Sequence, residues 1–63
     1  MYFVEQKYYD NGKTEARILL ESEAHQLGYK DGYSEEKESY DLYVDTRNTY
    51  EAALQLVKET LNA

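Results

Sequence analysis

Cysteine is absent from the 63-residue chain, and histidine occurs only once, as His25. Without cysteine no disulfide can stabilise the fold, and the redox compartment cannot be inferred from thiols. The chain has one imidazole and no carboxylates at the spacing of a calcium loop, so we expect no metal and no cofactor. Lys and Arg number only seven and are dispersed, which argues against direct binding of nucleic acid.

Long apolar runs and catalytic motifs are missing as well. No stretch approaches the roughly 18 to 20 apolar residues of a membrane span, and the first residues lack the pattern of a secretory signal. We therefore predict a cytoplasmic protein that has no contact with a membrane. There is no phosphate-binding glycine loop and no nucleophile constellation. His25 stands alone, and Glu35 and Glu36 lack the burial that would separate their pKa values, so we predict no enzymatic activity.

The shortness of the chain limits the core that it can form. A domain of this size buries only about 60% of the surface that its unfolded chain exposes. Small domains are commonly stabilised by disulfides, by a metal or by oligomerisation. With the first two excluded, self-association or a well-matched core is left.

The net charge of −6 arises entirely between residues 21 and 45. That window contains eight acids and two bases, whereas the five acids and five bases outside it cancel. The same window holds several tyrosines: Tyr29, Tyr33, Tyr40 and Tyr43. An acidic surface of this kind repels nucleic acid and anionic lipid and attracts a basic partner.

The dipeptide Asn11-Gly12 between two strand-like runs predicts a β-hairpin, since both residues tolerate the positive φ of tight turns. A two-residue loop would pair Lys7 with Ala16 and Glu5 with Ile18. It would place Glu5 and Lys7 on the same face as Phe3, Ile18 and Leu20, which makes a poor sheet. A three-residue loop with Gly12 as a left-handed bulge residue shifts the register by one and exchanges the faces. The shifted register creates opposite-charge pairs on one face and a mostly apolar opposite face. It predicts strands near 2–9 and 13–21 with the pairs Tyr8–Thr14, Gln6–Ala16, Val4–Ile18, Tyr2–Leu20, Lys7–Glu15, Glu5–Arg17 and Phe3–Leu19.

Two further elements are predicted in the second half of the chain. Residues 39–45 alternate with period two and predict a third strand. A helix is predicted over 49–62. Its expected N-cap is Asn48, because Glu51 follows at the spacing of a capping box, and Thr49 is the alternative cap. The predicted apolar stripe contains Tyr50, Ala53, Leu54, Val57 and Leu61, with Leu56 off the stripe.

These elements predict a single α+β domain over 1–63, with a three-stranded antiparallel sheet and one C-terminal helix packed on one face. Residues 22–37 show no sustained period and are predicted to form an acidic loop, with room for one helical turn at 23–27. The helix is expected to rest on the sheet residues Tyr2, Val4, Ala16, Ile18, Leu42 and Val44. The opposite face, with Phe3, Tyr9, Leu19 and Tyr43, would remain exposed, which usually marks contact with another chain. The edges of the sheet are unprotected as well. We therefore predict a homodimer through the sheet face or an edge, with Phe3, Leu19 and Tyr43 as the interface residues.

The segment 43–53, Tyr-Val-Asp-Thr followed by Thr-Tyr-Glu-Ala-Ala, resembles the strand-to-helix passage of many small bacterial and phage proteins. In those proteins a short antiparallel hairpin precedes a helix that begins with a Thr-Tyr-Glu-Glu-Ala-like sequence. The resemblance implies the architecture and no activity. In size, acidity and tyrosine content the chain is also similar to phage-encoded inhibitors that imitate nucleic acid, such as some anti-CRISPR proteins.

The acidic window with its tyrosines is the candidate binding site. Tyrosine beside an acid suits a partner's arginine through apolar area, charge and cation–π contact. We hypothesise a non-enzymatic protein-binding module that engages a basic surface, in its strongest form as a phage or mobile-element inhibitor of a nucleic-acid-binding protein. The alternative is a small assembly protein that self-associates through its exposed sheet face. The predicted partner-binding residues are Tyr29, Asp31, Tyr33, Glu35, Glu36, Glu38, Asp41 and Tyr43.

Packing is the competing role for six of the eight tyrosines. It is the favoured role for four of them: Tyr2, Tyr8, Tyr40 and Tyr50. For Tyr29 and Tyr33, packing and partner binding are equally favoured.

Overall fold

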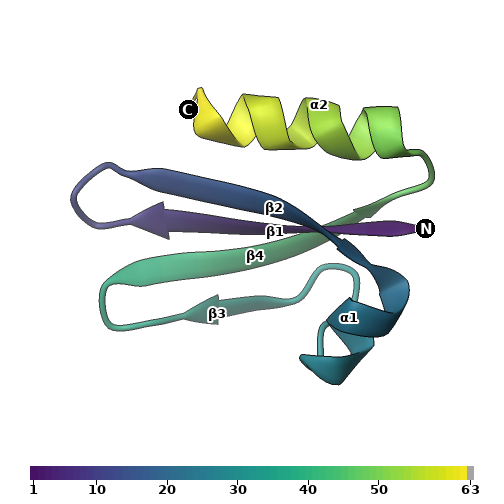
Figure 1. Cartoon of the computed structure of the whole chain (residues 1–63). Coiled ribbons are helices and arrows are strands. Elements are labelled where there is room, and N and C mark those ends of the chain that lie inside the picture. Colours follow the sequence, from purple (N-terminus) through teal and green to yellow (C-terminus); the bar gives the residue numbers. More distant parts are fainter. Residues whose placement is uncertain (63) are drawn as a thin grey trace.

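In the part of the chain that the computed structural model describes, residues 1–62, four antiparallel strands form one sheet (Figure 1). The elements along the chain are β1 (Tyr2–Tyr9), β2 (Thr14–Leu20), α1 (Glu21–Gln26), β3 (Ser34–Glu36), β4 (Tyr40–Arg47) and α2 (Tyr50–Leu61). The strand order β2-β1-β4-β3 makes β1 and β4 the central strands and β2 and β3 the two edges.

The predicted α+β class, the antiparallel sheet and the C-terminal helix are confirmed, but the described chain has four strands and two helices. Both additional elements fall within 22–37 and its border, where the sequence predicts a loop. α1 has six residues and buries only Ala24, and all three residues of β3 are exposed, so neither element has a periodic apolar pattern. The start of α1 is capped by Glu23, whose Oε1 accepts a hydrogen bond from the Leu20 N–H at 2.9 Å.

The β1–β2 hairpin has the three-residue loop and the register that the sequence predicts. Gly12 has a φ of 88°, in the left-handed region, and its N–H donates to the Tyr9 carbonyl at 3.0 Å. The ladder then begins with the Tyr9 N–H, which donates to the Lys13 carbonyl at 2.8 Å. All seven predicted cross-strand pairs are confirmed.

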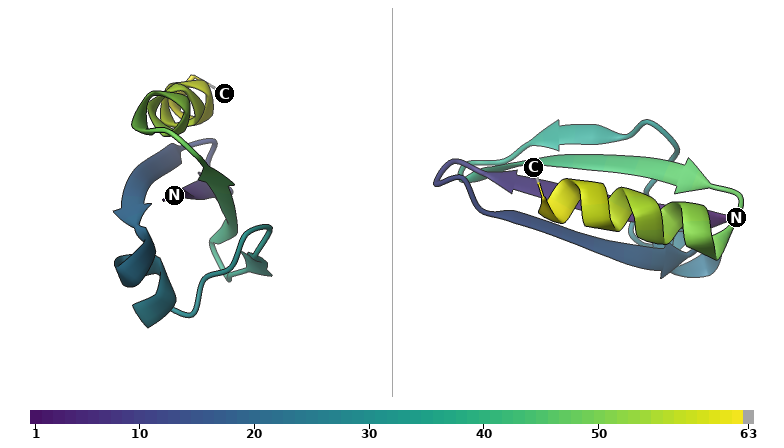
Figure 2. Two further views of the ribbon diagram at one scale, coloured as in Figure 1. Left: turned by 90° about the vertical axis from the view of Figure 1, so that its right-hand side faces the viewer. Right: turned by 90° about the horizontal axis from the view of Figure 1, so that it is seen from above.

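The two helices lie on opposite faces of the sheet (Figure 2). Gln6 of β1 lies beneath α2, since the Thr60 hydroxyl is 3.5 Å from its Oε1. Phe3, an odd number of residues away, points to the other side and packs against Ala24 of α1. We call these two sides of the sheet the α2 face and the α1 face.

The largest apolar cluster lies on the α1 face, and it contains Phe3, Leu19, Ala24 and Val44, with Tyr29 and Tyr33 packed against it. In the β1–β4 ladder Val44 pairs with Glu5, and Leu42 pairs with Lys7. Directly paired residues share a face, so both apolar residues of β4 belong to the α1 face. The prediction that Leu42 and Val44 support the C-terminal helix is therefore wrong.

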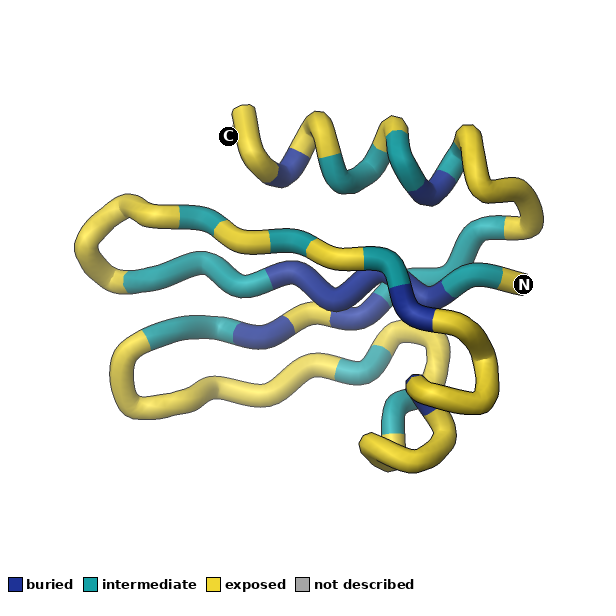
Figure 3. Tube along the Cα trace, in the orientation of Figure 1, coloured by how far each residue is buried: buried dark blue, intermediate teal, exposed yellow. Residues whose placement is uncertain are grey.

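The expectation of an exposed sheet face at Phe3, Leu19 and Tyr43 is also wrong. Phe3 and Leu19 are only 4% and 5% exposed, because α1 and the tyrosines of the following segment cover them. Tyr43 lies on the other face, since it pairs with Gln6, and it stays 44% exposed. Figure 3 shows the buried residues concentrated in β1 and β4, while β3 is exposed along its length.

α2 begins at the alternative cap that the sequence offers. The Oγ1 of Thr49 accepts a hydrogen bond from the Ala52 N–H at 3.1 Å, so Thr49 is the N-cap. The preferred assignment of Asn48 is wrong. The box with Glu51 does not form, since the third helical position after Thr49 is Ala52.

The buried side of α2 is rotated relative to the predicted stripe. Ala53 and Thr60 are buried, whereas Tyr50 and Leu61 are exposed. Thr60 can occupy an inward position because its hydroxyl donates to the Leu56 carbonyl at 2.9 Å. The rotation leaves an apolar flank of α2 in solvent.

Candidate functional site

α2 covers mainly the β2–β1 part of its face and leaves the β4–β3 part open (Figure 2). An open groove of about 490 Å³ lies on the uncovered part. Its lining consists of Gln6, Tyr8, Gly32, Tyr33, Asp41, Tyr43, Val44 and Asp45. We define the acidic face as five side chains on this side of the sheet, four from the groove lining and one from the adjoining β3. They are Tyr8, Asp41, Tyr43, Asp45 and Glu36.

The register of β4 between its two neighbours brings these side chains together. Tyr8 of β1 and Glu36 of β3 both pair with Asp41, one from each side. Tyr43 and Asp45 follow on the same face at steps of two residues. One wall of the groove is formed where the segment after α1 pairs with β4, through the Val44 N–H, which donates to the Tyr33 carbonyl at 2.8 Å.

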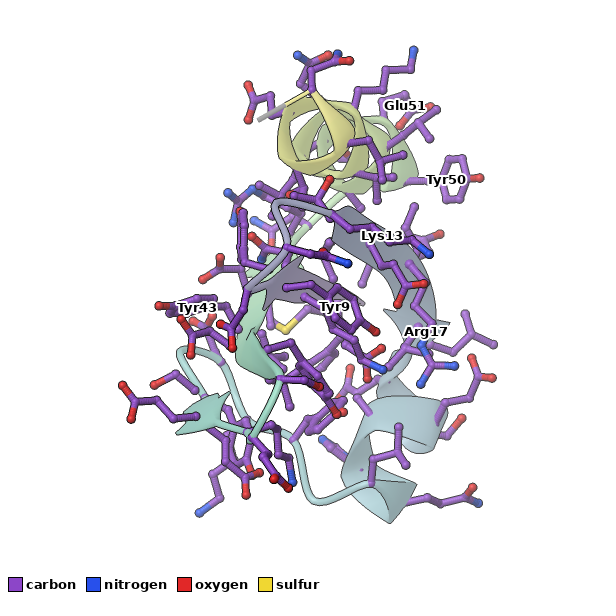
Figure 4. The ribbon with its side chains drawn as sticks, turned by 90° about the vertical axis from the view of Figure 1, so that its left-hand side faces the viewer. Tyr9, Lys13, Arg17, Tyr43, Tyr50 and Glu51 are labelled. Carbon is purple, nitrogen blue, oxygen red and sulfur yellow. The ribbon has the colours of Figure 1, made fainter. Side chains whose placement is uncertain are left out.

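Two tyrosines form the aromatic part of the acidic face. The rings of Tyr8 and Tyr43 are 5.7 Å apart at an interplanar angle of 75°, an edge-to-face arrangement. Tyr43 is the more exposed ring, and it projects on the side of the molecule opposite to Arg17 (Figure 4). Its hydroxyl and ring face are therefore available to a ligand.

No acid of this face takes part in an ion pair with another described residue. Glu36 lies directly opposite Asp41 on the same face, and like charges in that position destabilise a sheet. Across residues 1–62 the ion pairs use Glu5, Glu21 and Glu35, and none involves Glu36, Asp41 or Asp45. A bound cationic group would relieve this repulsion.

A buried amide supports the face from below. Gln6 is buried, and its Nε2 donates to Oδ2 of Asp45 at 3.0 Å. Its Oε1 lies 3.5 Å from the hydroxyls of both Tyr8 and Thr60. The Gln6 side chain thus links α2 to the acid and the aromatic ring of the face and limits their movement.

Tyr29, a predicted partner contact, is instead part of a buried polar cluster on the α1 face. Glu5 is only 4% exposed and accepts hydrogen bonds from Arg17 Nε at 2.8 Å, Arg17 Nη2 at 3.2 Å and the Tyr29 hydroxyl at 2.5 Å. Burial alone would raise the pKa of Glu5, but the hydrogen bonds from Arg17 and Tyr29 outweigh it and lower that pKa. Burial and the contact with Glu5 raise the pKa of Tyr29 well above its ordinary value. This geometry favours the packing role for Tyr29.

Tyr33 and Glu35 also satisfy each other within the chain. The Tyr33 hydroxyl donates to Glu35 Oε1 at 2.7 Å, and Lys37 Nζ is 3.0 Å from Glu35 Oε2. Hydrogen bonds from Tyr33 and then Lys37 lower the pKa of Glu35. The Tyr33 ring lies 5.4 Å from that of Tyr29. Glu35 is therefore the one predicted site acid of β3 whose charge is compensated.

The remaining predicted site residues divide between the face and the turns. Glu36, Asp41 and Tyr43 lie together on the acidic face. Asp31 and Glu38 are exposed in the turns before β3 and β4, away from any ion pair within residues 1–62.

Tyr8 and Asp45 are members of the acidic face that the predicted site does not include. For Asp45 a signal exists in the sequence, because the period-two alternation places it on the side of Asp41 and Tyr43. Tyr8 joins them only through the β1–β4 register, for which the sequence has no local marker.

Within residues 1–62, the side chains form no group of three or more His, Asp or Glu residues that could hold a metal ion. Neither described helix has the length and apolar character needed to cross a membrane. Compared with protein-family models, curated proteins and solved structures, the chain matches none.

Proposed function

We propose that the chain is a non-enzymatic protein-binding module whose acidic face engages a basic surface on another protein. One observation carries the proposal: Glu36, Asp41 and Asp45 adjoin the Tyr8–Tyr43 pair where α2 leaves the sheet open. Acids without basic neighbours create a negative potential that speeds the encounter with a basic partner. Exposed aromatic rings among them add cation–π contact.

Arginine is the side chain that this arrangement suits best. Its planar guanidinium can bond a carboxylate with two parallel hydrogen bonds and can also stack on an aromatic ring. Glu36 and Asp41 supply two carboxylates from paired positions, and Tyr43 is the adjacent exposed ring. Lysine lacks the planar fork and would bind through charge alone.

The partner that we propose is a nucleic-acid-binding protein, with the acidic face occupying its nucleic-acid site. Such sites present Lys and Arg to phosphates, and an acidic surface on a small protein can replace the phosphates. An inhibitor encoded by a phage or mobile element would act in this way. Asp31 and Glu38, exposed in the turns before β3 and β4, would add to the negative potential of the molecule.

Binding of a labelled arginine-rich peptide, followed by fluorescence anisotropy, tests the acidic face directly. The triple variant Glu36→Gln/Asp41→Asn/Asp45→Asn should bind about tenfold or more weakly. A matched control, Asp10→Asn/Glu51→Gln/Glu59→Gln, removes the same charge elsewhere and should bind nearly as wild type. Equal losses in the two triples would reduce the interaction to net charge and contradict a specific face.

The identity of the partner requires a second experiment. Proteins retained from a bacterial lysate on immobilised wild type are eluted with duplex DNA or with RNA. Retention of a nucleic-acid-binding protein that nucleic acid displaces, and that the acidic-face triple fails to hold, supports the proposal. Retention of the same proteins by the wild type and by the triple variant contradicts the proposal.

A further inference from the structure

The two edges of the sheet differ in length and charge. β3 has three residues, two of them acids, which is how proteins protect an edge against pairing with another strand. β2 has seven residues, and the charges on it, Glu15 and Arg17, cancel. Neither shortness nor a net charge therefore protects the β2 edge against pairing with another strand, as both do for β3.

Unpaired backbone groups are exposed along β2. The hydrogen bond between Tyr9 and Lys13 sets the alternation of the ladder, so odd-numbered residues of β2 bond to β1. The even-numbered residues Thr14, Ala16, Ile18 and Leu20 direct their N–H and C=O groups away from it. The Leu20 N–H is already bonded to Glu23, so the open stretch runs from Thr14 to Ile18 with Ala16 at its centre.

We infer that the β2 edge is an interface with a second copy of this chain, formed by antiparallel pairing around a two-fold axis at Ala16. In this register Ala16 lies opposite Ala16 of the other copy, and Thr14 lies opposite Ile18. These pairs have outward-directed backbone groups in both copies, and together they form about six hydrogen bonds. The sheet would become continuous through the dimer.

Charge complementarity supports this register. It places Glu15 of each copy directly opposite Arg17 of the other, which creates two opposite-charge pairs on the α1 face. Arg17 uses Nε and Nη2 for Glu5, which leaves Nη1 for the second copy. Its side chain is exposed, and Figure 4 shows it at the β2 side of the molecule.

Other two-fold registers are less suitable. An axis at Ile18 would set Glu15 opposite Glu21, a like-charge pair, and would require the Leu20 N–H that Glu23 occupies. An axis at Thr14 would pair Ala16 with Gly12, which belongs to the turn. Axes at Glu15 or at Arg17 would set each of these charged residues opposite its own copy, a like-charge pair. The axis at Ala16 is therefore the register that uses the open stretch and also pairs opposite charges.

Apolar side chains next to this edge would be covered at the same time. Leu61 of α2 is 52% exposed and lines a depression with Thr14, Glu15, Ala16 and Arg17. An axis at Ala16 brings the Leu61 side chains of the two copies near each other. Burial of an exposed leucine contributes to association through the hydrophobic effect. The acidic face lies on the opposite edge of the sheet and would stay accessible in the dimer.

Amide exchange measured at several protein concentrations tests the interface residue by residue. Between about 10 μM and about 1 mM the exchange of the Thr14, Ala16 and Ile18 amides should slow, because the dimer population rises with concentration. The Glu15 and Arg17 amides, bonded to β1, should be protected throughout. Equal exchange of Thr14, Ala16 and Ile18 at all concentrations would overturn the inference.

Variants test the same interface by sedimentation velocity. Ala16→Pro removes an outward N–H that β1 does not use, and should weaken the dimer about tenfold or more. Leu61→Glu should also weaken it, whereas Leu27→Glu, at a leucine of equal exposure beyond α1, should not. Circular dichroism verifies folding of each variant. A dimer unaffected by both Ala16→Pro and Leu61→Glu, or a monomer at every concentration, would overturn the inference.

Discussion

Glu5 and Asp41 are carboxylates on the two central strands of one sheet, but their surroundings are opposite. Glu5 lies on the α1 face, is almost fully buried and accepts hydrogen bonds from Arg17 and Tyr29. Asp41 lies on the α2 face opposite a second acid, Glu36, and has no ion pair within residues 1–62. A paired acid under a cover stabilises the fold, whereas an unpaired acid on an open face favours a cationic ligand. Whether a carboxylate stabilises the fold or stays free for a ligand therefore depends more on the elements that cover it than on the amount of charge.

The largest difference between the two faces should appear when one aromatic ring is removed from each. Phe3→Ala should lower the free energy of unfolding by about 3–5 kcal/mol, because it leaves a cavity in the α1-face cluster. Tyr43→Ala should lower it by about 1 kcal/mol or less, since the ring is largely exposed. Urea denaturation measures both values. Similar losses for the two variants would contradict the assignment of a closed and an open face.

A smaller effect is expected from the base that pairs with Glu5. Arg17→Met should lower the free energy of unfolding by about 2 kcal/mol, because the buried Glu5 carboxylate loses its two hydrogen bonds from Arg17. Water at the exposed position of the Arg17 side chain replaces them only in part. Lys13→Met removes an exposed base from the same hairpin and serves as the control, with a change near zero. Dilute protein in urea denaturation excludes a contribution from self-association. Restoration of stability by Glu5→Gln in the Arg17→Met background would confirm the coupling.

The contribution of Glu5 to stability should depend on pH, and this effect should be smaller still. Its pKa in the folded chain lies below the ordinary value of 4.5, so its contribution to stability is complete above that pH. The contribution is lost as the pH falls through the lowered folded pKa, since the protonated carboxyl no longer attracts Arg17. Glu5→Gln should therefore be less stable at neutral pH and should lose less stability than wild type on acidification. Thermal midpoints measured across this range check it, and parallel curves for the two proteins would refute it.

The smallest expected effect is a gain in stability on removal of one acid from the acidic face. Asp41→Asn should raise the free energy of unfolding by about 0.3 kcal/mol, because it relieves the like-charge pair with Glu36. The gain should shrink at high salt, and binding of the arginine-rich peptide should weaken in the same variant. Asp10→Asn, in the exposed hairpin loop, is the control. A loss of stability in Asp41→Asn would show that Asp41 has a structural partner.

The parts of the fold that local chemistry determines could be predicted from the sequence. Asn11-Gly12 and the charge pairs of β1 and β2 define the hairpin register, and all its pairs are confirmed. No turn connects β4 to β1, so their register depends on long-range packing, and a slip of one residue decides the face on which Leu42 and Val44 lie. β3 escapes prediction because three residues are too few for a pattern, and the single helical turn expected at 23–27 marks only part of α1.

The candidate site shows the same division. Alternation along β4 predicts that Asp41 and Tyr43 share a side, and the structure agrees. Composition alone cannot distinguish Glu35 from Glu36. The two differ in their contacts, because only Glu35 lies beside Lys37 and Tyr33. The sequence suits Tyr29 equally to packing and to binding, and the hydrogen bond from its hydroxyl to the buried Glu5 favours packing.

The alternation of β4 has a consequence for how this chain can change. Leu42 and Val44 are buried in the interior, whereas Asp41, Tyr43 and Asp45 interleave with them on the open side. Substitutions at 41 and 43 can thus accumulate without disturbing the packing that the even positions provide, whereas Asp45 also accepts a hydrogen bond from the buried Gln6. The side chains of the proposed binding surface can therefore change at 41 and 43 while the scaffold stays constant. A library randomised at 41 and 43, with Asp45 retained as the acceptor of Gln6, would sample new surfaces from folded proteins.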